Sequence, residues 1–214
     1  MPLSRKYNTI LIHIPKTGGS FITNRILRMG NKKGKEKGKG KHNFFGTTDG
    51  VEYTHLTAID IKNILGKETY HSFFSCAFVR NPFDRLVSEF FYLKKQKNAN
   101  KGFIKENNFK KFIHTLYNKF HLVTETPQYK INHYIPQYKF IMDEKENIIV
   151  DFVGRFELFD KDIKYILKKV GTTPNMSKTN TTTHKHYKHY YDEEMIKMVS
   201  EMYKKDLEFF NYDF

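Results

Sequence analysis

A lysine, two glycines and two hydroxyl residues stand close together near the start of the chain, in the segment Pro15-Lys-Thr-Gly-Gly-Ser20. Lysine supplies a compact positive charge, glycine lets the backbone approach a ligand, and the unpaired N–H groups of a helix start attract anions. The lysine precedes both glycines, unlike the usual nucleoside-triphosphate loop, in which it follows them. The segment predicts a phosphate cradle other than a Walker A loop. Its alternative is a glycine-bearing turn with a solvated lysine.

A second group of polar residues lies in the segment Arg80-Asn-Pro-Phe-Asp-Arg-Leu-Val-Ser88. Arg80 can present a bidentate fork to a phosphate, and Ser88, two helical turns further on, can add a hydroxyl. The alternative for Arg80 is a solvated charge or a member of a salt bridge, and Arg85 is interpreted as a structural ion-pair partner. The phosphate hypothesis gains its weight from the pairing of the two segments.

Each segment follows an apolar strand and begins a helix. Strands are predicted over residues 7–14 and 72–79, with helices following from residues 21 and 82. Asn81 is a good N-cap, Pro82 suits the first helical position, and Asp84 opposes the positive end of the helix dipole. Two anion sites at the carboxyl ends of strands are what an open α/β sheet offers to a ligand with two phosphate groups.

The two segments resemble the sulfotransferases that use 3′-phosphoadenosine 5′-phosphosulfate (PAPS), in particular their carbohydrate sulfotransferase branch. Weaker similarity in residues 151–157 and 203–212 extends the resemblance over nearly the whole chain. It implies one three-layer α/β domain with a mostly parallel sheet, like that of nucleotide kinases. The loop would hold the 5′-phosphosulfate and the arginine segment the 3′-phosphate. The residues assigned to cofactor binding are Lys16, Thr17, Gly18, Gly19, Ser20, Arg80 and Ser88, with Lys16 also catalytic.

A general base is needed to activate the acceptor hydroxyl, and His55 is the candidate. It precedes a predicted helix that begins at a capping box of Thr57 and Asp60 and stops at Gly66. The positive helix end favours a neutral imidazole, and the resemblance to glycan 2-O-sulfotransferases implies the role of base. A histidine that only shapes the helix start is the alternative. The competing bases are Glu52 and Asp49, and Lys178 or His184 are candidates for a loop over the nucleotide.

Composition indicates one domain over residues 1–214, since 214 residues without a Pro/Ser linker suffice for a single core. The formal net charge of +14 is partly gathered in a Lys/Gly-rich run, residues 30–43, which predicts a flexible loop and either a solvated tether or a collar for an anionic glycan. Sparse arginine and the absence of aromatic residues among these lysines argue against specific nucleic-acid binding. No signal peptide or transmembrane segment is recognised, so a cytoplasmic location is expected.

Other patterns predict scaffold. Cys76 is expected to pack as a small hydrophobe, and His13 as a core histidine. An apolar stripe over 109–120 predicts a buried helix face, and a third strand is expected over 148–156, followed by a helix over 160–170. The histidines of residues 184–189 alternate with other residues and lack a zinc-ligand pattern, so no metal is predicted.

The function predicted is transfer of the sulfuryl group of PAPS to a hydroxyl of an acceptor, an anionic or neutral glycan, without metal. The alternatives are an ATP-dependent P-loop-like kinase, which would need carboxylates arranged on magnesium, and a non-enzymatic protein that binds polyanions or nucleic acid through charge alone.

Overall fold

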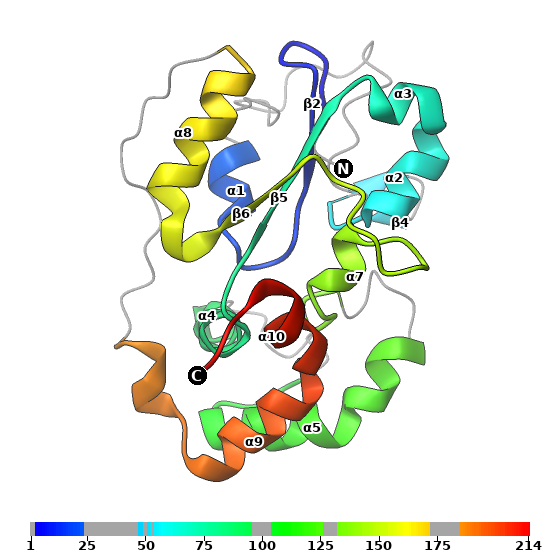
Figure 1. Cartoon of the computed structure of the whole chain (residues 1–214). Coiled ribbons are helices and arrows are strands. Elements are labelled where there is room, and N and C mark those ends of the chain that lie inside the picture. Colours follow the sequence, from blue (N-terminus) through cyan, green and yellow to red (C-terminus); the bar gives the residue numbers. More distant parts are fainter. Residues whose placement is uncertain are drawn as a thin grey trace. The chain divides into compact units, whose positions relative to one another are not determined.

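The computed structural model describes residues 3–23, 47–48, 51–52, 54–95, 104–125, 132–171 and 185–214 (Figure 1). The chain divides into two compact units, and each is described by itself. The first consists of Met1–Val79 and Lys139–Thr179, the second of Arg80–Tyr138 and Asn180–Phe214. The Lys/Gly-rich loop expected at residues 30–43 lies outside the described residues, and the single domain over 1–214 stays a prediction.

A four-stranded sheet in the order β1-β2-β5-β6 forms the centre of the first unit. Strand β2 pairs in parallel with β5, and β5 pairs in parallel with β6, whereas β1 runs antiparallel to β2. The prediction of an α/β fold with a mostly parallel sheet is therefore confirmed. The short β1 was not predicted, because two residues carry no readable alternation. The strands are β1 (Leu3–Ser4), β2 (Thr9–Ile12), β5 (Phe74–Val79) and β6 (Phe152–Arg155).

The predicted third strand over 148–156 is too long at both ends. Ile148 instead forms an isolated antiparallel bridge with Met142, around a turn in which the Asp143 carboxylate accepts hydrogen bonds from the Lys145 and Asn147 N–H groups. At the other end a 3-10 helix, η3, begins at Phe156. An apolar run cannot distinguish a residue that pairs in the sheet from one that pairs in a local turn.

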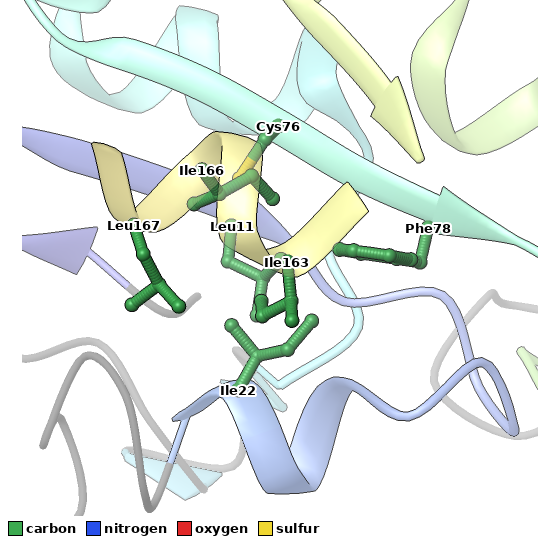
Figure 2. Close-up of a cluster of buried hydrophobic side chains, with 7 residues drawn as sticks. All are labelled: Leu11, Ile22, Cys76, Phe78, Ile163, Ile166 and Leu167. Atoms are coloured by element: carbon green, nitrogen blue, oxygen red, sulfur yellow. The ribbon is translucent and has the colours of Figure 1, made fainter. Parts of the chain in front are cut away.

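An apolar cluster between the sheet and helix α8 (Phe159–Lys169) forms the core of the first unit (Figure 2). Helix α8 follows β6 and packs along it. Cys76 is fully buried in this cluster, as expected, and burial with the nearby Asp151 carboxylate raises the pKa of its thiol to about 12. The buried members are Leu11, Ile22, Cys76, Phe78, Ile163, Ile166 and Leu167.

The helix expected before Gly66 is confirmed as α2 (Ala58–Leu65). Thr57 and Asp60 form the predicted capping box, in which each side chain bonds the other residue's backbone N–H. Gly66 ends the helix with a φ of +80°, which glycine adopts without strain. The remaining elements of this unit are α1 (Gly19–Phe21), β3 (Thr47–Thr48), β4 (Val51–Glu52), α3 (Lys67–His71) and η3 (Phe156–Leu158).

The regular elements that the structure describes in the second unit are helices. Phe112, Ile113 and Leu116 are fully buried, which confirms most of the predicted stripe, whereas Tyr117 is exposed and donates to Glu201. No helix of the described residues is both long and apolar enough to cross a membrane. The elements are α4 (Pro82–Lys95), α5 (Phe109–Glu125), η4 (Tyr187–Tyr190), α9 (Glu193–Met202) and α10 (Lys204–Phe210), and α7 (Tyr138–Ile141) spans the boundary of the two units.

Candidate active site

The segment from Lys16 to Ser20, called the loop below, follows the buried strand β2 in the first unit and includes the first two residues of helix α1. Its backbone turns through two left-handed residues, Lys16 at φ 68° and Gly18 at φ +87°. The N–H groups of Phe21 and Ile22 both donate to the Gly18 carbonyl, at 3.0 and 3.3 Å. A left-handed conformation costs a non-glycine residue about 1 kcal/mol, so the surrounding contacts hold the half-buried Lys16 in a defined backbone geometry.

The two glycines of the loop are required for different reasons. Gly18 has a positive φ, and a Cβ there would stand 2.9 Å from the Phe159 ring. A Cβ on Gly19 would stand 2.0 Å from Cδ2 and 2.4 Å from Nε2 of His13, which no ordinary packing allows. The imidazole of His13 therefore lies against the loop backbone at Gly19. Sequence spacing alone attributed both glycines to the approach of a ligand.

The hydroxyl of Thr17 donates to the Ile14 carbonyl at 2.9 Å, and Thr17 is only 1% exposed. This bond closes the turn from within, so the side chain shapes the loop. Ser20, in contrast, is exposed. Binding of a cofactor by either residue stays a prediction.

His55 contacts the residue that packs against the loop. Its Nδ1 lies 2.7 Å from the His13 carbonyl oxygen, and the two imidazole rings are 4.6 Å apart between centroids, inclined at 46°. His55 stands two residues before the capping residue Thr57, as the sequence predicted. The structure thus brings His55 together with the loop through His13, which is 6% exposed and packed as expected.

The side chains of the two alternative bases, Glu52 and Asp49, are not among those that the structure describes. Glu52 ends strand β4, and nothing is described of its side chain, while Asp49 lies outside the described residues. Lys178 and His184 also lie outside them. Within the described ranges, no group of three or more His, Cys, Asp or Glu side chains is arranged to hold a metal ion.

Arg80 and Ser88 belong to the second unit. Arg80 is 7% exposed, and its Nε donates to Oδ2 of Asp84 at 2.8 Å, one helical turn further on. Asn81 caps helix α4 as predicted, since its Oδ1 accepts the Phe83 N–H at 2.9 Å. Ser88 is buried on the same helix. The Asp84 carboxylate therefore orients the guanidinium beside the helix start.

Arg85 is a structural residue, as expected, but backbone carbonyls hold it. Its guanidinium donates to the Ile135 carbonyl at 3.0 Å and to that of His133 at 3.5 Å, and lies 5.3 Å from the Tyr203 ring centroid. The sequence did not indicate Gln137, whose side chain bonds the Arg80 backbone. The two residues are 57 positions apart, and a contact at that separation leaves no periodic pattern in the sequence.

A lysine and glycine segment after strand β2 and an arginine after strand β5 of a mostly parallel sheet are typical of α/β proteins that bind phosphate-bearing ligands. A model of the Sulfotransferase family matches residues 2–213, and the chain belongs to this family. It is therefore a PAPS-dependent transferase. Over 130 residues it is 28% identical to a protein of Archaeoglobus fulgidus described as uncharacterized, in an alignment covering 60% of this chain and 93% of that protein. No solved structure matches the chain.

Proposed function

We propose that the protein transfers the sulfuryl group of PAPS to a hydroxyl of a carbohydrate, with His55 as the general base. The observation that carries this proposal is the 2.7 Å contact between His55 Nδ1 and the His13 carbonyl. A carbonyl can only accept a hydrogen bond, so Nδ1 must carry the ring proton. The neutral imidazole then has its lone pair on Nε2, where it can accept a proton from a hydroxyl.

Each of the two units carries residues that suit one anionic group of the cofactor. Lys16 stands in a loop whose backbone conformation is fixed by Gly18 and by the Thr17 hydroxyl. In the second unit, Asp84 orients the Arg80 guanidinium, and arginine binds phosphate in a bidentate manner. These features support binding of the 5′-phosphosulfate by residues 16–20 and of the 3′-phosphate by Arg80 with Ser88.

When bound, PAPS supplies an activated sulfuryl group whose departure leaves negative charge on a phosphate. The positive charge of Lys16 stabilises that charge without a change of protonation. His55 receives the acceptor proton at Nε2, while its Nδ1–H remains on the His13 carbonyl and keeps the ring oriented. The contributions of the chain are thus electrostatic at Lys16 and acid–base at His55, and no metal is part of the proposal.

A carbohydrate acceptor is proposed from the resemblance to the glycan branch and from the excess of positive charge, +14 formally, which favours an anionic partner. Family membership gives no support to an ATP-dependent kinase or to a protein that only binds polyanions. Screening neutral and anionic glycans with labelled PAPS identifies the acceptor, and transfer to none of them would remove the carbohydrate from the proposal.

Thermal unfolding with added nucleotide tests the cofactor. Adenosine 3′,5′-bisphosphate at a hundred times its dissociation constant is expected to add about 2.7 kcal/mol to native stability, with or without EDTA. Stabilisation by ATP with magnesium, and none by the bisphosphate, would contradict the proposal.

Two substitutions with matched controls test the residues. Lys16→Ala is expected to abolish transfer, and His55→Ala to lower turnover by roughly a hundredfold or more while nucleotide affinity is kept. Lys67 and His71 are exposed residues of helix α3, and their alanine variants serve as controls with unchanged turnover. Full turnover in the His55 variant would assign the base elsewhere, with Glu52 as the first candidate.

A further inference from the structure

One side chain bonds both backbone polar groups of Arg80, at the point where strand β5 has ended and helix α4 is about to begin. Oε1 of Gln137 accepts the Arg80 N–H at 2.8 Å, and Nε2 of Gln137 donates to the Arg80 carbonyl at 2.8 Å. Gln137 is completely buried. The side-chain amide therefore bonds Arg80 in the way that the peptide group of a neighbouring strand would. Among the described residues, no strand pairs with Arg80 itself.

A buried carboxylate holds Gln137 in turn. Asp206 of helix α10 is completely buried, and its Oδ2 accepts from the backbone N–H of Gln137 at 2.8 Å and from Nε2 at 3.3 Å. Its Oδ1 accepts the Tyr138 N–H at 2.9 Å. Since a carboxylate oxygen in these contacts only accepts, the NH₂ group of Gln137 must face Asp206, and its Oε1 is left for the Arg80 N–H. Asp206 thus fixes which way the amide of Gln137 points.

Arg80 is consequently held at two places. Gln137 fixes its backbone, and Asp84 fixes its side chain through Nε at 2.8 Å. A guanidinium that recognises a phosphate in a bidentate manner depends on its direction as well as its charge, because its N–H groups lie in one rigid plane. Burial makes the polar contacts of Gln137 costly to lose, so the arrangement is strongly specified.

We propose that Gln137, supported by Asp206, is a positioning residue that sets Arg80 for recognition of the 3′-phosphate and so makes the protein selective for nucleotides that carry one. This inference rests on the proposed function, in which Arg80 binds that phosphate. Gln137 acts through the Arg80 backbone and touches no ligand itself.

The test compares two nucleotides that differ only in the 3′-phosphate, adenosine 3′,5′-bisphosphate and adenosine 5′-monophosphate, by calorimetric titration of the full chain. Gln137→Met keeps the length of the side chain and removes both bonds to Arg80. It is expected to weaken binding of the bisphosphate about tenfold and to leave the monophosphate unchanged. Tyr203→Phe is the matched control, because it removes another buried hydrogen bond of the same unit, to the Tyr134 carbonyl at 2.8 Å, and is expected to alter neither affinity.

A double-mutant cycle separates positioning from general damage to the fold. In an Arg80→Ala background, Gln137→Met is expected to have no further effect on the ratio of the two affinities, since its route of action is gone. An equal loss for both nucleotides, or the same loss of ratio with and without Arg80, would overturn the inference. Gln137→Asn, which keeps an amide but cannot reach, replaces the methionine variant if that one does not fold, with the same loss expected.

Failure of the proposed function gives a different result. If the wild-type protein does not prefer the bisphosphate, the assignment of Arg80 to the 3′-phosphate is wrong and the inference is overturned with it. If the wild-type protein prefers the bisphosphate and the Gln137 variants keep that preference in full, the proposed function stands and only the role of Gln137 is refuted.

Discussion

Replacing Gly19 by alanine tests whether the imidazole of His13 packs on the loop and carries its geometry to His55. The new Cβ would stand 2.0 Å from Cδ2 of His13, whereas ordinary van der Waals contact begins at 3.4 Å. A shift of a few tenths of an ångström cannot relieve such an overlap, so the ring of His13 must leave its place. Overpacking of this kind costs about 1–3 kcal/mol of unfolding free energy.

Displacing His13 also disturbs His55, whose ring lies 4.6 Å from it and whose Nδ1 bonds its carbonyl. A misplacement of about 1 Å at a catalytic group lowers turnover by roughly a hundredfold. We expect Gly19→Ala to lose turnover by roughly tenfold to a hundredfold under conditions where it remains folded. Urea unfolding gives the stability, and transfer of labelled sulfuryl group gives the turnover.

A compensating variant makes the prediction specific. In a His13→Ala background the space beside Gly19 is vacant, so Gly19→Ala is expected to cost less than about 0.5 kcal/mol there. Gly154→Ala is a control for overpacking elsewhere, because its Cβ would meet the Phe78 ring at 2.7 Å and should lower stability without affecting turnover of the folded protein. Equal costs of Gly19→Ala in the two backgrounds would refute the packing argument.

Three further predictions concern single side chains. Cys76 is expected to resist iodoacetamide at pH 8 until the protein is unfolded, since it is buried and a pKa of about 12 leaves about one thiol in 10⁴ ionised; rapid labelling of the native protein would contradict this. Thr17→Val is expected to lower the unfolding free energy in urea by about 1 kcal/mol, and Thr17→Ser to restore most of it, because only serine keeps the bond to the Ile14 carbonyl. Burial raises the pKa of Asp206 above its unfolded value, so its contribution to stability is greatest below about pH 4 and falls as the pH rises from there. In the Asp206→Asn variant, the unfolding free energy measured at several pH values should no longer show this decrease. A dependence of the unfolding free energy on pH identical to that of the wild type would count against the prediction.

Local rules predicted much of the fold. The capping box at Thr57, the cap at Asn81 and the stop at Gly66 each depend on residues two to four positions apart, and all three are present. Strand limits were less predictable, because the apolar run from Ile148 does not reveal that Ile148 pairs with Met142.

The identity of the candidate site residues could be predicted from short sequence segments. The contacts between residues far apart in the sequence could not. His55 was identified, but its bond to the His13 carbonyl joins residues 42 positions apart. The contact of His13 with Gly19 was hidden for another reason: the two residues are six positions apart, but their approach depends on how the backbone turns between strand β2 and helix α1. Residue spacing shows which side chains are available for binding or catalysis, and tertiary packing determines how they are oriented.

The bonds of Gln137 also bear on the order in which the second unit folds. The contacts from Gln137 to Arg80 and to Asp206 close chain segments of 57 and 69 residues, whereas helix α4 begins with the bond from Arg85 N–H to the Asn81 carbonyl, four residues apart. Long closures cost more entropy and form later than local turns. We expect hydrogen exchange during refolding to protect the Arg85 amide before that of Arg80; simultaneous protection would contradict this order. The arginine assigned to the cofactor would then be among the last parts of its unit to take shape, although the helix that follows it is among the first.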